Sequence, residues 1–178
     1  MNDFTAQIEK AAREHFFETG ALDPGALVYY PEVREICAGN GCGNYGKSWA
    51  CPPAVGTLAE CRERIGRYEN MLLFSSKYDL EDSFDFEGMH ASLHKFKQTV
   101  ASFRSDIQKL LPRYLLLSNE GCGQCETCTY PHAPCRFPER LCHSLEGYGF
   151  LVSELAKSAG MHYHNGANTV TYFGALLF

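Results

Sequence analysis

The chain has 178 residues, of which 45% are hydrophobic and 21% are charged, and its formal net charge is −5. This composition is typical of a folded globular domain and excludes a largely disordered chain. The negative charge and the scattered basic residues argue against a nucleic-acid or membrane-surface partner, and no apolar run is long enough to span a bilayer. The start, Met1-Asn2-Asp3-Phe4, lacks the basic and apolar stretches of a signal peptide, so we expect a cytoplasmic protein.

The first elements along the chain are two helices with a short strand between them. Apolar residues at steps of three and four predict a helix over 4–18. The apolar run 26–30, ended by a proline, favours a short strand. Thr57 and Glu60 have the spacing of a capping box with Thr57 as the N-cap, which predicts that a second helix begins there and runs to about residue 69.

The rest of the chain alternates strands and helices. Its clearest pattern is a series of apolar residues from Met89 to Leu110, at steps of four and three, which predicts a long amphipathic helix. The expected elements are a strand at 71–76, this helix at 89–110, a strand at 114–117, a helix at 145–159, and a final strand pair at 161–163 and 169–178. This order predicts one α/β or α+β domain over residues 1–178, with a mixed sheet and flanking helices.

Nine cysteines are many for a chain expected in the cytoplasm. A dense set of thiols in a reducing compartment usually binds metal and does not form disulfides. The odd number also excludes complete pairing within one chain. The cysteines form two groups, in loops at 37–61 and 122–142, each rich in glycine and proline and each placed just before a helix. We therefore predict two metal-binding loops.

The loop at 122–142 holds the strongest metal-binding pattern. Cys122, Cys125 and Cys128 are separated by two residues each, and Cys135 follows after six more. Three thiolates at this spacing on one tight loop can each bind a different iron of a [4Fe–4S] cluster. A zinc ion is more often held by two Cys-x2-Cys pairs from separate hairpins, so the spacing favours iron–sulfur and leaves structural zinc as the alternative.

The loop at 37–61 offers three further ligands, Cys37, Cys42 and Cys51. The glycines between them give the backbone the freedom to wrap around a cluster. Cys51-Pro52 also repeats the Cys-Pro junction that closes the cysteine run of bacterial ferredoxins. Three cysteines leave such a site one ligand short.

Cys61 is the nearest candidate for the missing ligand. It lies in the first turn of the helix that Thr57 caps, where the helix dipole favours a thiolate. It also lies on the apolar stripe of that helix, so an ordinary buried cysteine is the other interpretation. In that case one iron would be open, or Cys135 or Cys142 would bind it. The predicted metal ligands are Cys37, Cys42, Cys51, Cys61, Cys122, Cys125, Cys128 and Cys135.

Several motifs extend the pattern beyond the cysteines. They are Tyr45-Gly46-Lys47-Ser48-Trp49-Ala50-Cys51-Pro52-Pro53, the Cys122–Cys128 run, Pro134-Cys135-Arg136-Phe137-Pro138, and Asn168-Thr169-Val170-Thr171-Tyr172 with Gly174. In combination they resemble an uncharacterised family of cysteine-rich predicted metal-binding proteins of anaerobic bacteria and archaea. Ser144 to Glu146 also fit the family pattern, whereas Cys142 departs from it. The resemblance implies a cytoplasmic metal-binding, iron–sulfur protein and no established reaction.

We therefore predict a protein with two [4Fe–4S] clusters that transfers electrons to or from a partner redox enzyme. One alternative is an enzyme or substrate carrier that uses an open iron of the first cluster. Another is a structural zinc protein that acts as an interaction module. The sequence indicates no catalytic residue and no oligomeric state, and it leaves open whether the protein is an enzyme.

Overall fold

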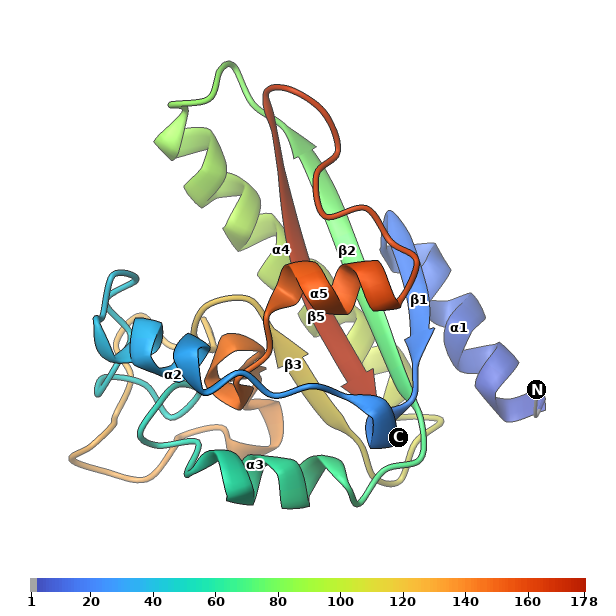
Figure 1. Ribbon diagram of the computed structural model, residues 1–178, viewed down its shortest axis with the longest axis horizontal. Helices are drawn as coiled ribbons and strands as arrows, with labels where there is room; N and C mark the ends of the chain where they lie inside the picture. Colours follow the sequence, from blue (N-terminus) through green and yellow to red (C-terminus); the bar gives the residue numbers. More distant parts are fainter. Residues whose placement is uncertain (1–2) are drawn as a thin grey trace.

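A five-stranded mixed sheet forms the middle layer of the computed structural model, which describes residues 3–178 (Figure 1). Its strands are β1 (Glu18–Leu22), β2 (Met71–Asp79), β3 (Leu115–Ser118), β4 (His143–Ser144) and β5 (Thr169–Leu177). They follow the order β1-β2-β5-β3-β4, and every neighbouring pair is antiparallel except β3 and β4, which are parallel. Met1 and Asn2, part of the chain start considered above, lie outside the described residues.

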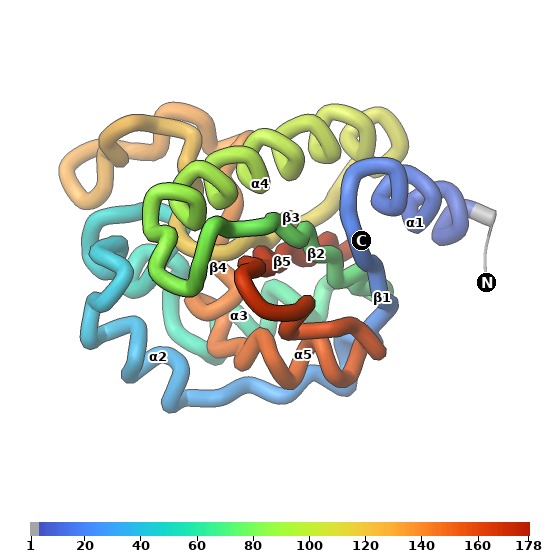
Figure 2. Tube along the Cα trace, turned by 90° about the horizontal axis from the view of Figure 1, so that it is seen from above, coloured from blue at the N-terminus to red at the C-terminus, as the bar shows by residue number. Residues whose placement is uncertain are grey.

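Helices cover both faces of this sheet, as Figure 2 shows from above. On one side lie α1 (Asp3–His15) and α4 (Phe86–Ile107), and on the other lie α2 (Pro31–Ala38), α3 (Leu58–Ile65) and α5 (Val152–Ser158). Short 3-10 turns occur at Pro24–Ala26, Pro138–Arg140 and Glu146–Tyr148. The predicted α/β class with a mixed sheet and flanking helices is therefore confirmed. None of the helices found between residues 3 and 178 has the length and apolar character needed to cross a membrane.

Two apolar cores form because the central strands are buried on both faces. Successive residues of β2 point to opposite sides, so Leu73 packs in the core with α3 and α5, whereas Phe74 packs in the core with α1 and α4. Phe16 stacks on Phe74 with ring centroids 4.0 Å apart. Gly174 of β5 pairs with Phe74, and a Cβ at this position would collide with the Phe74 ring.

Most predicted elements are confirmed with shifted ends. Thr57 Oγ1 accepts the N–H of Glu60, and the Glu60 carboxylate accepts the N–H of Thr57, so the predicted capping box is present at the start of α3. The predictions at 71–76, 89–110, 114–117 and 169–178 correspond to β2, α4, β3 and β5. The predicted helix at 145–159 divides into a 3-10 turn and α5, because Gly149 between them has a left-handed φ of 77°.

Two predicted elements are wrong, and a third ends earlier than predicted. The run 26–30 forms no strand, since the N–H of Tyr30 bonds to the carbonyl of Gly149, which belongs to a loop. The backbone at 161–163 follows the end of α5 without joining the sheet. The first helix ends at His15 and not near 18, because the chain then enters β1 and pairs along β2. Neither β1 nor α2 is among the predicted elements.

Both cysteine-rich loops lie at the same end of the sheet in Figures 1 and 2. The first loop, residues 39–57, connects α2 to α3, and the second loop, residues 119–142, leaves β3 and returns in β4. The parallel pairing of Ser118 with Ser144 brings the two ends of the second loop together. The N–H of Ser144 also donates to the carbonyl of Ala50 at 2.9 Å, so β4 joins the first loop to the second.

Candidate metal centres

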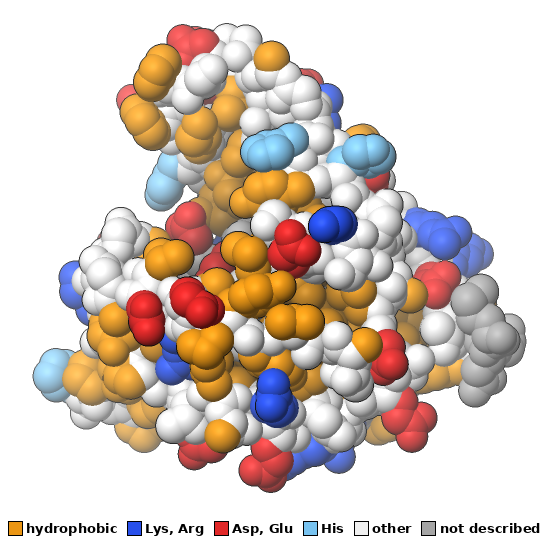
Figure 3. All heavy atoms as spheres, viewed as in Figure 1, with side chains coloured by type: hydrophobic (Ala, Val, Ile, Leu, Met, Phe, Trp, Pro, Cys, Tyr) orange, Lys and Arg blue, Asp and Glu red, His pale blue; other side chains and the backbone are white. Residues whose placement is uncertain are grey.

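The second loop surrounds a cavity of about 510 Å³, here named the second cavity. All four of its predicted ligands line this cavity, namely Cys122, Cys125, Cys128 and Cys135. α4 forms another wall with Lys97 and with the exposed side chains of His90 and His94. Figure 3 shows the surface hollowed between the lobe where α4 begins and the part that carries the two loops.

Contacts from the first loop and within the second loop hold the second loop in place around the second cavity. The indole Nε1 of Trp49 donates to the carbonyl of Ala133 at 3.1 Å, and the Trp49 ring packs edge-on against Tyr130. Within the second loop, a guanidinium nitrogen of Arg136 donates to the carbonyl of Thr127 at 2.8 Å. The segment between Cys128 and Cys135 is therefore fixed by side chains and does not depend on regular secondary structure.

Cys122 is half-buried, like the other three cysteines of this cavity. Burial raises the pKa of this thiol, and the backbone N–H groups of Cys142 and Gln124, which donate to the sulfur, act in the opposite direction. The cations of Lys97 and Arg104 also favour the thiolate. Backbone N–H groups directed at a cysteine sulfur stabilise a metal-bound thiolate and tune the potential of an iron–sulfur cluster.

Lys97 fixes the turn that leads from β3 into the second loop. Its amine donates to the backbone carbonyls of Asn119, Glu120 and Gly121, the last at 2.6 Å, and to the Ser118 hydroxyl at 3.3 Å. Burial lowers the pKa of Lys97, and the negative charges of nearby thiolates and carboxylates oppose this effect. No motif in the sequence marks Lys97, because its role depends on the packing of α4 beside the end of β3.

The first loop forms a smaller cavity of about 270 Å³, here named the first cavity. Cys37, in the last turn of α2, lines it together with Cys42 and Cys51. Burial raises the pKa of Cys37 to about 11, and the charges of Glu146 and the other two cysteines add to the increase. The structure therefore brings three predicted ligands of the first cysteine group, Cys37, Cys42 and Cys51, around one cavity.

Cys51 lies where the two loops meet. Burial raises the pKa of its thiol, while the Ser144 hydroxyl and the backbone N–H of Gly121 donate to the sulfur and lower it. Gly121 belongs to the second loop and itself lines the second cavity. Glu120 lines both cavities. The two candidate sites are thus direct neighbours, which the separation of the cysteine groups along the sequence does not reveal.

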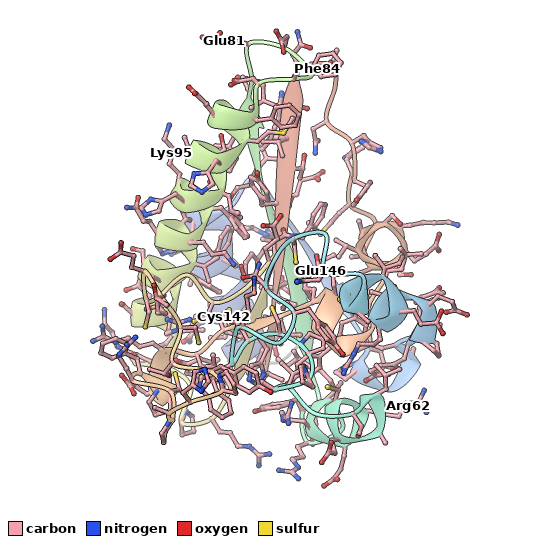
Figure 4. All side chains as sticks on the ribbon, turned by 90° about the vertical axis from the view of Figure 1, so that its left-hand side faces the viewer. Arg62, Glu81, Phe84, Lys95, Cys142 and Glu146 are labelled. Atoms are coloured by element: carbon pink, nitrogen blue, oxygen red, sulfur yellow. The ribbon has the colours of Figure 1, made fainter. Side chains whose placement is uncertain are left out.

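Glu146 is a further candidate site residue that the sequence did not predict. Its side chain lines the first cavity, and Figure 4 places it beside the first loop and α2. One carboxylate oxygen, Oε1, accepts a hydrogen bond from Asn119 Nδ2 at 3.2 Å. The other, Oε2, is buried and has no hydrogen-bond partner among residues 3–178. The only signal in the sequence is its match to the family pattern at Ser144 to Glu146.

Two cysteines lie apart from both cavities. The thiol of Cys61 is fully buried in the core beneath α3 and donates to the carbonyl of Val55 at 3.6 Å. Cys142 is buried in the core on the α4 side, with its thiol donating to the carbonyl of Leu116 at 3.3 Å. The structure does not bring Cys61 to the other three cysteines of the first group, and its assignment as a ligand stays a prediction.

Across the described residues, no group of three or more His, Cys, Asp or Glu side chains is arranged to hold a single metal ion. The predicted loop at 37–61 is also helical at its ends, because Cys37 belongs to α2 and Cys61 belongs to α3.

Comparison with known proteins assigns the chain to a family. Residues 20–178 match the family model described as "Predicted metal-binding protein (DUF2284)". Because this match covers most of the chain, the protein belongs to that family. No curated protein and no solved structure matches the chain. Membership supports metal binding and confirms that part of the resemblance seen in the sequence.

Proposed function

We propose that this member of the predicted metal-binding family holds two [4Fe–4S] clusters and exchanges electrons with a partner redox protein. The second cavity would bind one cluster through its four cysteines, and the first cavity would bind the other through Cys37, Cys42 and Cys51. The observation that carries the proposal is the division of seven of the nine cysteines between two adjacent cavities.

The type of donor atoms and the spacing of the cysteines along the chain support the choice of metal. Sites rich in thiolate select soft metals and iron–sulfur clusters. A tetrahedral zinc ion with bonds of about 2.3 Å to sulfur holds its sulfurs within about 3.8 Å of each other. A [4Fe–4S] cluster separates them further, because each cysteine binds a different iron. The spacing of Cys122, Cys125 and Cys128 along one loop therefore supports the cluster over the single ion.

The polar groups around the sulfurs support a redox role. A bound cluster supplies one-electron redox chemistry. The chain directs two backbone N–H groups at the sulfur of Cys122, and one N–H and one hydroxyl at Cys51. Lys97 places a positive charge beside Cys122, Glu120 and Glu146. These groups stabilise the negative charge that thiolate ligands and an added electron bring to a site.

The arrangement of the two cavities supports electron exchange with a partner. The N–H of Gly121 in the second loop donates to Cys51 in the first, so few atoms separate the two sites. The second cavity reaches the surface, where the exposed His90 and His94 border it and the partly exposed Phe137 also lines it. We propose that the redox partner docks over this opening.

The test is the content of iron, zinc and acid-labile sulfide in protein purified without oxygen. We expect about eight irons per chain with matching sulfide, as two cubane clusters require. A Cys122→Ser/Cys125→Ser variant should lose about half of the iron, and a Cys37→Ser/Cys42→Ser variant should lose the other half. Cys142→Ala is the matched control, because this thiol lines neither cavity. Stoichiometric zinc without sulfide would refute the proposal and support a structural zinc module.

One observation favours a second candidate function. No fourth cysteine lines the first cavity, so an iron without a cysteine ligand could bind substrate. The protein would then be an enzyme or a substrate carrier. A change in the electron paramagnetic resonance spectrum on adding a small ligand such as cyanide would support this function, and an unchanged spectrum would count against it.

A further inference from the structure

We infer that Glu146 supplies the fourth ligand of the cluster in the first cavity, through its carboxylate oxygen Oε2. This inference rests on the proposed function, because it assigns a ligand to one of the two proposed clusters. It also differs from the sequence-based prediction, in which Cys61 fills that position.

The first cavity offers three thiols, two carboxylates and the hydroxyls of Tyr45 and Ser144 as donors. The thiols are those of Cys37, Cys42 and Cys51, and the carboxylates are those of Glu120 and Glu146. Cys61 does not line this cavity, and its thiol bonds to a backbone carbonyl in the core. The Ser144 hydroxyl already accepts the N–H of Gly147 and donates to Cys51. A carboxylate binds iron more strongly than a neutral hydroxyl, so the fourth protein ligand is expected from Glu120 or Glu146.

Glu146 differs from Glu120 in its surroundings. Glu120 is an exposed residue whose carboxylate can be hydrated. The Oε2 atom of Glu146 is shielded from water and accepts no hydrogen bond from any described residue. An unpaired, buried carboxylate oxygen is costly, so such atoms usually bind a water molecule or an ion. An iron ion in the cavity is a partner of the right charge and type.

The carboxylate is held in a fixed orientation. Asn119 Nδ2 donates to Glu146 Oε1 at 3.2 Å, which leaves Oε2 free. Asn119 is itself anchored to β5, because its backbone N–H donates to the carbonyl of Phe173 at 3.0 Å and its Oδ1 accepts the N–H of the same residue. Metal ligands are commonly oriented by such outer hydrogen bonds.

The backbone next to Glu146 is tied to the helix that carries Cys37. Arg34 of α2 donates to the carbonyl of Gly147 at 2.6 Å and to the carbonyl of Gly56 at 2.8 Å. A Cβ at Gly147 would lie only 2.5 Å from Ser144 Oγ, so the glycine allows this turn to pack closely. The thiol of Cys37 and the carboxylate of Glu146 are therefore held on elements that are locked together, facing one cavity.

The test compares Glu146→Cys and Glu146→Gln with Glu120→Gln in protein enriched with ⁵⁷Fe. In the wild type we expect the Mössbauer spectrum to show about one iron in eight with an oxygen ligand. Glu146→Cys should keep the iron content but lose this distinct signal, since all ligands become thiolates. Glu146→Gln keeps the shape of the side chain and should lose the signal or the first cluster. Glu120→Gln should match the wild type.

The outcomes separate the two proposals. Wild-type protein without acid-labile sulfide would overturn the proposed function itself. Two intact clusters with identical spectra in the wild type and in all three variants would overturn only the role of Glu146. Loss of the distinct signal in Glu120→Gln, with Glu146→Gln unchanged, would move the ligand to Glu120 and overturn the inference. Circular dichroism of each variant shows whether the chain still folds, and Glu146→Cys keeps the test decisive if Glu146→Gln does not.

Discussion

Replacing Lys97 with methionine tests how the second loop is held at the end of β3. Methionine keeps the length and apolar character of the side chain but removes the amine. The amine donates to three consecutive backbone carbonyls, those of Asn119, Glu120 and Gly121, and to the Ser118 hydroxyl. Glu120 is exposed, so its carbonyl can bond to water in the variant, and the hydroxyl can rotate to another partner. The carbonyls of Asn119 and Gly121 are left without a substitute.

The expected loss of stability follows from these two carbonyls. A hydrogen bond to a charged donor is worth about 1.5 kcal/mol or more, so two of them give a loss of about 3 kcal/mol. For a domain of this size the melting temperature should fall by roughly 6–12 °C. The assay is urea unfolding and thermal unfolding of the metal-free protein, which separates the effect on the fold from the effect on cluster binding.

Lys95→Met is the matched control for this experiment. Lys95 lies on the same helix, and Figure 4 shows it pointing away from the loops. A substitution at such an exposed position should change the free energy of unfolding by less than about 0.5 kcal/mol. If Lys97→Met were as stable as Lys95→Met, the amine would not hold the turn, and the reasoning would be refuted.

Three further predictions concern the core and the first group of cysteines. Gly174→Ala should destabilise the protein by about 1–3 kcal/mol in thermal unfolding, because its Cβ would meet the Phe74 ring, whereas Gly41→Ala, with open space around it, should be nearly neutral. Burial lowers the pKa of His143 from 6.5 to about 4. On acidification, His143 is therefore protonated in the unfolded chain before it is protonated in the folded protein. The free energy of unfolding should therefore fall by about 3 kcal/mol because of His143 as the pH drops from 6.5 toward 4. His143→Gln should flatten that part of the plot of stability against pH. An equal slope in both proteins would contradict the lowered pKa of His143. Cys61→Ala should keep all of its iron while losing about 1 kcal/mol of stability, and loss of the first cluster in this variant would restore Cys61 as a ligand.

The parts of the fold that the sequence predicts are those encoded locally. The capping box of Thr57 and Glu60 sits within four consecutive residues and needs no tertiary contact. The periodic apolar pattern of α4 likewise belongs to the helix itself. β1 was not predicted, since its residues Glu18–Leu22 have little strand character and pair only because β2 offers a free edge. The run 26–30 has strand character but finds no edge to pair with.

The candidate sites likewise combine features encoded locally, which the sequence predicts, with features that depend on tertiary contacts, which it does not predict. The spacing of Cys122, Cys125 and Cys128 lies on one loop, so their convergence on one cavity could be predicted. The contact between Cys51 and Gly121 depends on how β4 joins the two loops, and no local pattern encodes it. Glu146 likewise reaches the first cavity because of the way β4 joins the two loops, which no local pattern encodes. Cys61 lies near the first loop in the sequence, but its side chain packs in the core and does not line the first cavity.

The segment from Asn119 to Gly121 serves both sites at once, since Asn119 orients Glu146, Glu120 lines both cavities, and Gly121 donates to Cys51. If the proposed clusters bind in the two cavities, ordering this segment at one cavity would prepare it for the other and make cluster uptake cooperative. Thermodynamic linkage requires the effect to be equal in both directions. Native mass spectrometry of partly loaded protein should then find mainly empty and doubly loaded chains, whereas independent sites would give a large singly loaded population. Three residues at the start of the second loop would in this way set an all-or-none threshold for the maturation of the whole protein.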